Sequence, residues 1–137
     1  MTADIVVTTA KVAAQPGTIT RSYIAAVALD AGKAVYCLTA GTVGLCESGT
    51  AAPVRTFFGI ALESVGAGSA VLVAHEGVVD GFTVSASNAG ALLYTSATGG
   101  AISDATTGAD CKVGKVIARS DGTKTVWFRT NWLANIA

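Results

Sequence analysis

Short apolar runs, bounded by glycine or polar residues, recur along the chain from Tyr23 onward. A helical period of 3.6 residues is not sustained anywhere, although Val84 to Ala91 are compatible with a turn of helix. Runs of this length and spacing are typical of antiparallel strands in a β-sandwich or β-barrel. The expected strands are Ile24 to Leu29, Lys33 to Thr39, Thr56 to Leu62, Ala70 to Ala74, Leu92 to Thr95, Val113 to Ala118 and Lys124 to Arg129. We therefore expect a compact all-β antiparallel domain.

Residues 1–22 have a different pattern, polar and rich in threonine. They contain one strand-like run, Ile5-Val6-Val7-Thr8, and a Pro16-Gly17 turn. We interpret residues 1–22 as an extended N-terminal arm and residues 23–137 as a single β-rich domain. A chain of 137 residues can bury roughly two thirds of its unfolded surface in one core.

The domain contains an internal similarity, which indicates a duplicated unit. The segment Ala31 to Tyr36 is echoed 58 residues later by Ala89 to Tyr94. The segment Phe58 to Ser64 is echoed, with an offset of 55 residues, by the segment Val113 to Ser120. Each unit reads as a glycine-led strand ending near tyrosine, a hairpin, and then a strand, turn and strand. The repeats span residues 30–78 and 88–130, and together they can close one core.

The composition is apolar but poor in charge. Apolar residues make up 51% of the chain, while charged residues make up 13% and nine basic side chains balance nine acidic ones. Proteins that bind nucleic acid usually carry a basic excess, because each neutralised phosphate needs a Lys or Arg. We therefore expect no nucleic-acid partner, and we expect apolar surface patches to be covered by protein partners.

The sequence contains no candidate membrane segment. Asp30 and Lys33 interrupt the longest apolar stretch, Tyr23 to Leu38, so no run of 18 apolar residues occurs. The first residues have Asp4 where a signal peptide would carry Lys or Arg. We expect a protein that has no membrane partner and that is made and kept inside the cell that synthesises it, unless lysis releases it.

His75 is the single histidine, and a catalytic interpretation would pair it with Glu76 or Asp80 as a general base. Neighbouring residues of a strand point to opposite faces, so His75 and Glu76 would not converge. The glycine pairs at 66–68 and 99–100 lack the Lys and Ser/Thr of a phosphate-binding loop, and no Gly-x-Ser-x-Gly elbow occurs. We therefore expect neither an enzyme nor a cofactor.

Three cysteines, Cys37, Cys46 and Cys111, offer no CxxC pair and no zinc-ligand spacing. We therefore expect no metal site. If Gly41-Thr42 forms a two-residue hairpin turn, Cys37 faces Cys46 at about 4.5–5.5 Å between Cα atoms, which permits a disulfide. A reducing compartment argues against the bond, and the alternative is that both are small buried apolar residues.

Aromatic residues concentrate near the end of the chain. Trp127 and Phe128 alternate within an expected strand, so one of them faces the core. Trp132 and Leu133 follow that strand in the terminal segment. Large apolar side chains there either cap the core or anchor a subunit contact, where Trp is enriched. We take Trp132 and Leu133 as subunit-contact candidates.

The glycine-led runs taken together resemble the capsid decoration, or cement, proteins of tailed bacteriophages. The likeness covers residues 24–130 and is made of these segments: Asp30 to Tyr36, Phe58 to Leu62, Gly77 to Val79, Ala89 to Tyr94 and Val113 to Ile117. The resemblance implies a small β-rich subunit that binds the outside of the phage head, commonly as a homotrimer, and stabilises it. It implies the major capsid protein as partner, the virion exterior as location, and no catalytic residues. The cysteines and the Asn131-Trp132-Leu133 tail depart from the family pattern.

Two hypotheses follow. In the first, the arm grips capsid subunits by adding Ile5, Val6, Val7 and Thr8 as a strand to a neighbouring sheet edge. In the second, the chain is a receptor- or glycan-binding module of a head fibre or tail appendage, which requires an exposed aromatic site.

Overall fold

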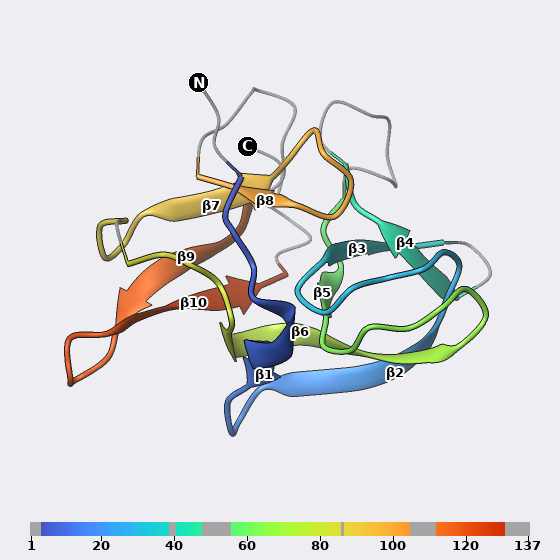
Figure 1. Cartoon of the computed structure of the whole chain (residues 1–137), viewed down its shortest axis with the longest axis horizontal. Helices are drawn as coiled ribbons and strands as arrows, with labels where there is room; N and C mark the ends of the chain where they lie inside the picture. Colours follow the sequence, from blue (N-terminus) through green and yellow to red (C-terminus); the bar gives the residue numbers. More distant parts are fainter. Residues whose placement is uncertain (1–3, 39–40, 48–55, 86, 105–111, 131–137) are drawn as a thin grey trace.

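The computed structural model describes residues 4–38, 41–47, 56–85, 87–104 and 112–130, and within them the fold is all-β, as predicted. The described strands belong to one ten-stranded sheet (Figure 1). The strands are β1 (Ala13–Ala14), β2 (Ile19–Ala25), β3 (Ala34–Cys37), β4 (Thr42–Leu45), β5 (Gly59–Ala61), β6 (Ala70–Asp80), β7 (Leu92–Thr95), β8 (Ile102–Ser103), β9 (Lys112–Ala118) and β10 (Lys124–Arg129). Thr9–Lys11 form a short 3-10 helix, the one helix among the described residues. The described part of 84–91 forms turns instead, with Ser87 N–H donating to Val84 O.

The first half of the sheet closes into a small barrel. Its strands pair in the order β2-β4-β3-β5-β6, and β6 pairs with β2 to complete the ring. All these pairs are antiparallel except β2 with β4, which are parallel. In the sheet, β4 lies between β2 and β3. Closure removes free sheet edges wherever the pairing extends. The interior is filled by small and branched side chains, Ala25, Leu29, Val35, Val43, Ala61, Val71 and Val73.

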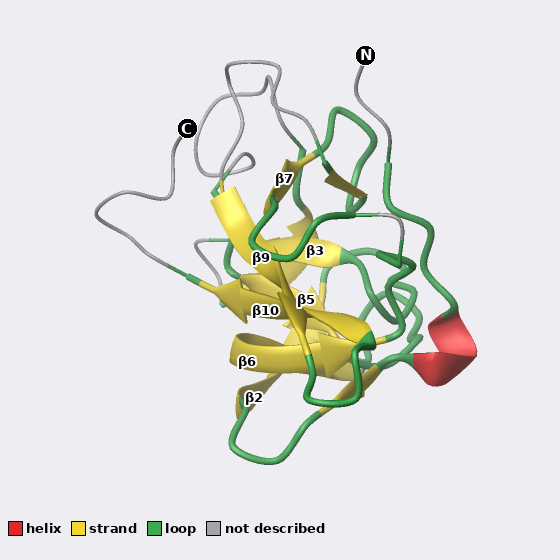
Figure 2. Ribbon diagram, turned by 90° about the vertical axis from the view of Figure 1, so that its left-hand side faces the viewer, coloured by secondary structure: helices red, strands yellow, loops and turns green. Residues whose placement is uncertain are grey.

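The second half repeats this arrangement with β7, β8, β9 and β10 (Figures 1 and 2). β7 pairs with β8 and β9, and β9 pairs with β10, as β3 pairs with β4 and β5, and β5 with β6. Buried residues occupy matching places in the two halves: Val35 and Leu93, Val43 and Ile102, Ala61 and Val116, and Val73 and Val126.

Backbone hydrogen bonds repeat between the halves as well. Gly32 N–H donates to Ala61 O at 2.7 Å, and Gly90 N–H donates to Val116 O at 2.7 Å. Both glycines have positive φ, 93° and 90°, a backbone conformation that other residues rarely adopt. The segments related by sequence similarity are therefore structurally equivalent.

The equivalence extends beyond the sequence repeats of 30–78 and 88–130. In the first half, Thr20 of β2 pairs with Ala74 of β6. In the second half, Val78 of β6 pairs with Trp127 of β10 in the same way. The strand β6 therefore ends the first unit with its N-terminal part and begins the second unit with its C-terminal part.

The two units close differently. In the first, Ala26 N–H donates directly to Val43 O of β4. In the second, the place of Ala26 is taken by the N-terminal segment, because Ile5 N–H donates to Ile102 O of β8 at 2.7 Å. The N-terminal segment is thus an extra strand of the second barrel.

We predict that Gly114→Ala lowers the free energy of unfolding by about 1–3 kcal/mol, as expected for overpacking. A Cβ at Gly114 would overlap the carbonyl oxygen of Trp127 on β10. Urea denaturation measures the change. Gly66→Ala is the matched control, because a Cβ there has no atom within 4 Å. Equal stability of the two variants would contradict the close approach of β9 to β10.

Candidate functional site

The mouth of the first barrel is a half-open cavity of about 430 Å³. β2 and β6 provide most of its wall. Barrel mouths are common ligand sites because side chains from several strands converge there. The cavity is lined by Ile19, Arg21, Tyr23, Phe58, His75, Glu76 and Thr130.

Three rings meet edge to face in this mouth. The ring centroids of Tyr23 and Phe58 are 5.2 Å apart, and those of Phe58 and His75 are 4.6 Å apart. Edge-to-face packing at these distances is favourable because the positive edge of one ring meets the negative face of another. All three side chains are half-buried, so the cluster is both packed and accessible.

The hydrogen bonds of His75 determine its tautomer. Nδ1 lies 2.8 Å from Phe58 O, and Nε2 lies 2.7 Å from the Tyr23 hydroxyl. A carbonyl oxygen only accepts, so Nδ1 carries the proton and donates to Phe58 O. When the ring is neutral, Nε2 therefore accepts from the Tyr23 hydroxyl. Both ring nitrogens are used to position the aromatic cluster.

The carboxylates considered as partners of His75 bind elsewhere. Glu76 lies 3.6 Å from Arg129 on β10, and Asp80 binds Arg119. The prediction that His75 and Glu76 would not form a pair is consistent with these contacts. Sequence reasoning missed Tyr23 and Phe58 as neighbours of His75, because they lie 52 and 17 residues away along the chain. No local pattern signals such contacts.

Burial raises the pKa of Tyr23 above its ordinary value, and the charge of Arg21 offsets part of this effect. The cause is desolvation, which disfavours the phenolate. The hydroxyl therefore stays protonated at neutral pH and is available as the donor to His75.

The predicted arm run, Ile5 to Thr8, lies against its own chain. Thr83 N–H donates to Val6 O at 2.9 Å, and Thr8 N–H donates to Gly81 O at 2.8 Å. Ile5 and Val7 pack on the core of the second barrel, whereas Val6 is 66% exposed.

The expectation of a separate arm over residues 1–22 is therefore corrected for residues 4–22. Residues 4–14 pair with the second barrel, and residues 19–22 are the start of β2. The physical reason is alternation: Ile5 and Val7 bring apolar side chains to the core while the backbone between them forms strand hydrogen bonds.

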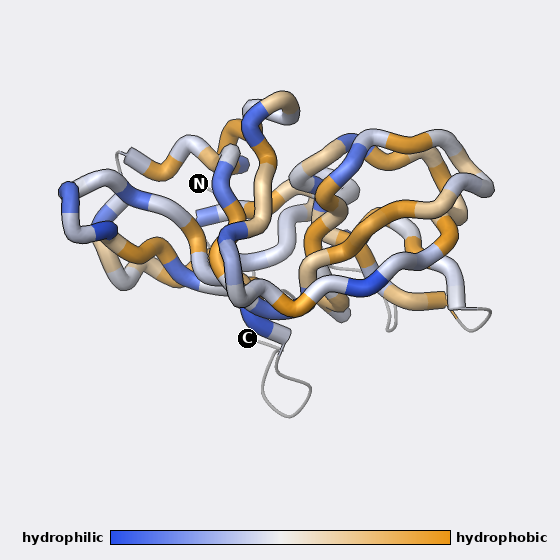
Figure 3. Tube along the Cα trace, turned by 90° about the horizontal axis from the view of Figure 1, so that it is seen from below, coloured by the Kyte–Doolittle hydropathy of each residue, from blue (hydrophilic) through white to orange (hydrophobic). Residues whose placement is uncertain are grey.

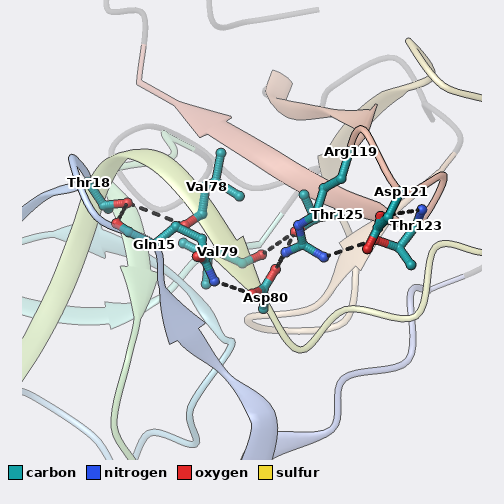
Figure 4. Close-up of polar contacts among 9 residues, drawn as sticks. All are labelled: Gln15, Thr18, Val78, Val79, Asp80, Arg119, Asp121, Thr123 and Thr125. Atoms are coloured by element: carbon teal, nitrogen blue, oxygen red, sulfur yellow. Dashed lines mark hydrogen bonds and ion pairs between the residues drawn. The ribbon is translucent and has the colours of Figure 1, made fainter.

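Asp80 joins the N-terminal segment to the second barrel (Figure 4). Its carboxylate accepts hydrogen bonds from the Gln15 side-chain amide, from the Arg119 guanidinium, and from Thr125 Oγ1 at 2.7 Å. The Thr18 hydroxyl donates to Gln15 O at 2.7 Å, which orders the turn leading into β2. One carboxylate thus holds three separate segments.

The proposed pairing of Cys37 with Cys46 is not present. Cys37 pairs with Val43, and Cys46 N–H donates to Ala34 O, so the hairpin register differs by three residues from the expected one. The reason is the turn: Gly41 has φ of +81° and its N–H donates to Leu38 O, so the turn precedes Thr42. The two sulfurs form no disulfide in the described part of the chain, and Cys46 is buried, as its small apolar character predicts.

Phe128 is fully buried in the core, whereas Trp127 is half-exposed with Lys115 Nζ 5.5 Å from its ring centroid. Only one of the two adjacent aromatics faces the core, as strand alternation predicts. Trp132, Leu133 and Cys111 lie outside the described residues.

Within the described residues, no three His, Cys, Asp or Glu side chains gather as a metal site requires. No helix in the described part is long and apolar enough to cross a bilayer. Comparison with protein-family models, with curated proteins and with solved structures finds no match to this chain. Its function must therefore be inferred from the chemistry of its own surfaces.

We predict that Tyr23 ionises above the ordinary tyrosine pKa of about 10. The absorbance titration of the native protein minus that of Tyr23→Phe isolates this group. Because its pKa is raised in the folded state, unfolding favours the phenolate, so stability falls as pH rises from about 10 through the folded pKa. A difference titration centred at or below the value of free tyrosine would contradict the effect of partial burial on the Tyr23 hydroxyl.

We predict that Asp80→Ala loosens the N-terminal segment and costs about 1–2 kcal/mol of stability, a modest value because the carboxylate is partly exposed. Hydrogen exchange should become faster at the amides of Thr8 and Gln15. Asp121→Ala is the control, since this exposed carboxylate accepts hydrogen bonds from nearby Thr123. Unchanged exchange at Gln15 in Asp80→Ala would show that Asp80 does not hold the segment.

Proposed function

We propose that this protein is a structural virion protein that binds the outer surface of a tailed-phage capsid and stabilises it. The observation that carries the proposal is a set of exposed large apolar side chains along one strand of the first barrel. Ile19, Ile24 and Val27 are 55%, 45% and 42% exposed, and all three lie on β2 or directly after it. Exposed apolar side chains on both faces of one strand favour a protein partner that covers this strand.

The hydropathy of the first barrel supports the same proposal. Hydrophilic positions include the turn between β9 and β10, whereas apolar and neutral positions make up most of the first barrel (Figure 3). With a net charge of zero, attachment would depend on apolar contact and strand pairing rather than on electrostatic steering. A shell that presents many identical sites makes such moderate contacts sufficient.

The partners in this proposal are the major capsid protein and further copies of this chain as a homotrimer. In this proposal the run Ile5 to Thr8 contributes fewer contacts to the capsid than a free arm would. Ile5 and Val7 are engaged with the chain's own core, so Val6 and Thr8 are the side chains of this run that are available for contact.

A second candidate function is a receptor- or glycan-binding module. The aromatic mouth of the first barrel favours it, because Tyr23, Phe58 and His75 offer ring edges beside Arg21 and Glu76. Sugars are bound by aromatic rings together with charged hydrogen-bonding groups.

We predict that the purified chain has about three times its monomer mass of 13.6 kDa in light scattering and sediments with expanded heads of the phage that encodes it. Ile24→Ser should weaken binding roughly tenfold, because a buried Ile contributes about 1.5–3 kcal/mol. Leu92→Ser is the matched control, since Leu92 is 44% exposed but lies on the second barrel.

A monomer that stays in the supernatant with heads would overturn the capsid proposal. Binding to a glycan array that Phe58→Ala abolishes would instead support the second candidate.

A further inference from the structure

One edge of β2 is unpaired over most of its length. Along its other edge, β2 pairs with β6 from Ile19 to Ile24. On the open side, β4 reaches only Ile24 and Ala25, and no strand of the described residues pairs with positions 19–23. Figures 1 and 2 both place β2 at the lower margin of the molecule.

The hydrogen-bonding groups on this edge follow from the alternation of an antiparallel pair. Ala25 N–H donates toward β6, to Ser69 O, whereas Ala26 N–H donates to the opposite side, to Val43 O. Alternate residues of a strand bond to opposite neighbours. The N–H and C=O groups of Thr20 and Ser22 therefore point away from β6 toward the open side.

The second unit of the internal repeat shows what kind of segment pairs with the edge equivalent to the open edge of β2. Val78 and Asp80 of β6 occupy the places of Thr20 and Ser22 in the second unit. Their outer edge is covered, because Gln15 N–H donates to Val78 O at 2.8 Å and Ala13 pairs with Asp80. The covering segment, Ala13-Ala14-Gln15, is extended and uncharged. The same edge in the first unit lacks such a segment among the described residues.

The side chains beside the open edge suit an added strand. Exposed edges in native proteins are usually protected by lysine, proline or a bulge. Here the protection is limited to Arg21 and a register shift between Ile19 and Thr20. Ile19 and Ile24 flank the edge with exposed apolar surface.

We propose that the edge of β2 from Ile19 to Tyr23 accepts an extended segment of the capsid shell protein as an added strand. This proposal rests on the proposed function and names its attachment surface. The segment would be uncharged or would carry an acidic residue opposite Arg21, with apolar residues near Ile19 and Ile24. Main-chain hydrogen bonds provide affinity in such additions, and alternate side chains provide specificity.

A second copy of this chain is the less favourable occupant. Antiparallel pairing of two β2 edges requires a two-fold axis, which does not fit the homotrimer proposed above. In the register with Thr20 opposite Ser22, the two Arg21 side chains would also lie directly opposite each other. Like charges at opposing positions destabilise a strand pair. The chain's own N-terminal segment is already bound to the second barrel.

The test compares Thr20→Pro with Thr20→Ala in sedimentation with expanded heads. Proline removes the outward N–H and is tolerated at a sheet edge, whereas alanine keeps the N–H and removes only the side chain. We expect at least a tenfold loss of affinity for Thr20→Pro and less than a twofold change for Thr20→Ala. Circular dichroism verifies folding, and Ser22→Pro with Ser22→Ala provides a second matched pair if Thr20→Pro does not fold.

Hydrogen exchange gives an independent readout on the unmodified chain. Binding to heads should slow exchange at the amides of Thr20 and Ser22 at least tenfold. If the unmodified chain binds heads while proline and alanine variants bind alike and these amides remain unprotected, the edge proposal is overturned and the capsid function stands. If the unmodified chain does not bind heads, both are overturned.

Discussion

Both barrels depend on β6, because one strand of eleven residues supplies hydrogen bonds to each of them. Its N-terminal part pairs with β2 and β5, and its C-terminal part pairs with β10 and β1. The side chains follow the same division. Val71 and Val73 fill the first barrel, whereas Val79 belongs to the core of the second. A continuous strand therefore fixes the relative position of the two units and leaves no linker between them.

The repeated glycines let neighbouring strands approach closely. Gly59 pairs with Val35, and Gly114 pairs with Leu93 at the equivalent position. At each glycine a Cβ would overlap the backbone of the following strand, at Ala74 O for Gly59 and at Trp127 O for Gly114. Small barrels have strongly curved sheets, and glycine permits the tight spacing that this curvature requires.

The two barrels differ in the segment that completes the ring of strands. This difference determines that the first barrel has an open β2 edge and an accessible aromatic mouth. The second unit has incorporated the N-terminal segment as a strand, held by Asp80 and by the packing of Ile5 and Val7. The first unit closes on itself through β4 and leaves an edge of β2 and an aromatic mouth accessible. A duplicated fold thus presents one covered and one uncovered version of the same edge.

The sequence by itself determined the all-β class, the approximate strand positions and the duplication, because these follow from local alternation and from glycines at turns. Glycine recurs at Gly32 and Gly90 because both positions have positive φ, which other residues rarely adopt. Sequence reasoning misjudged the pairing register of the hairpin at Gly41 by three residues, since apolar alternation alone does not choose among turns of different length.

Only the tertiary structure decided where the run Ile5 to Thr8 docks. It alone also brings Tyr23, Phe58 and His75 together at one barrel mouth. These contacts join residues far apart in the chain. Their free energy comes from burial and pairing in the closed barrels, which no local pattern encodes.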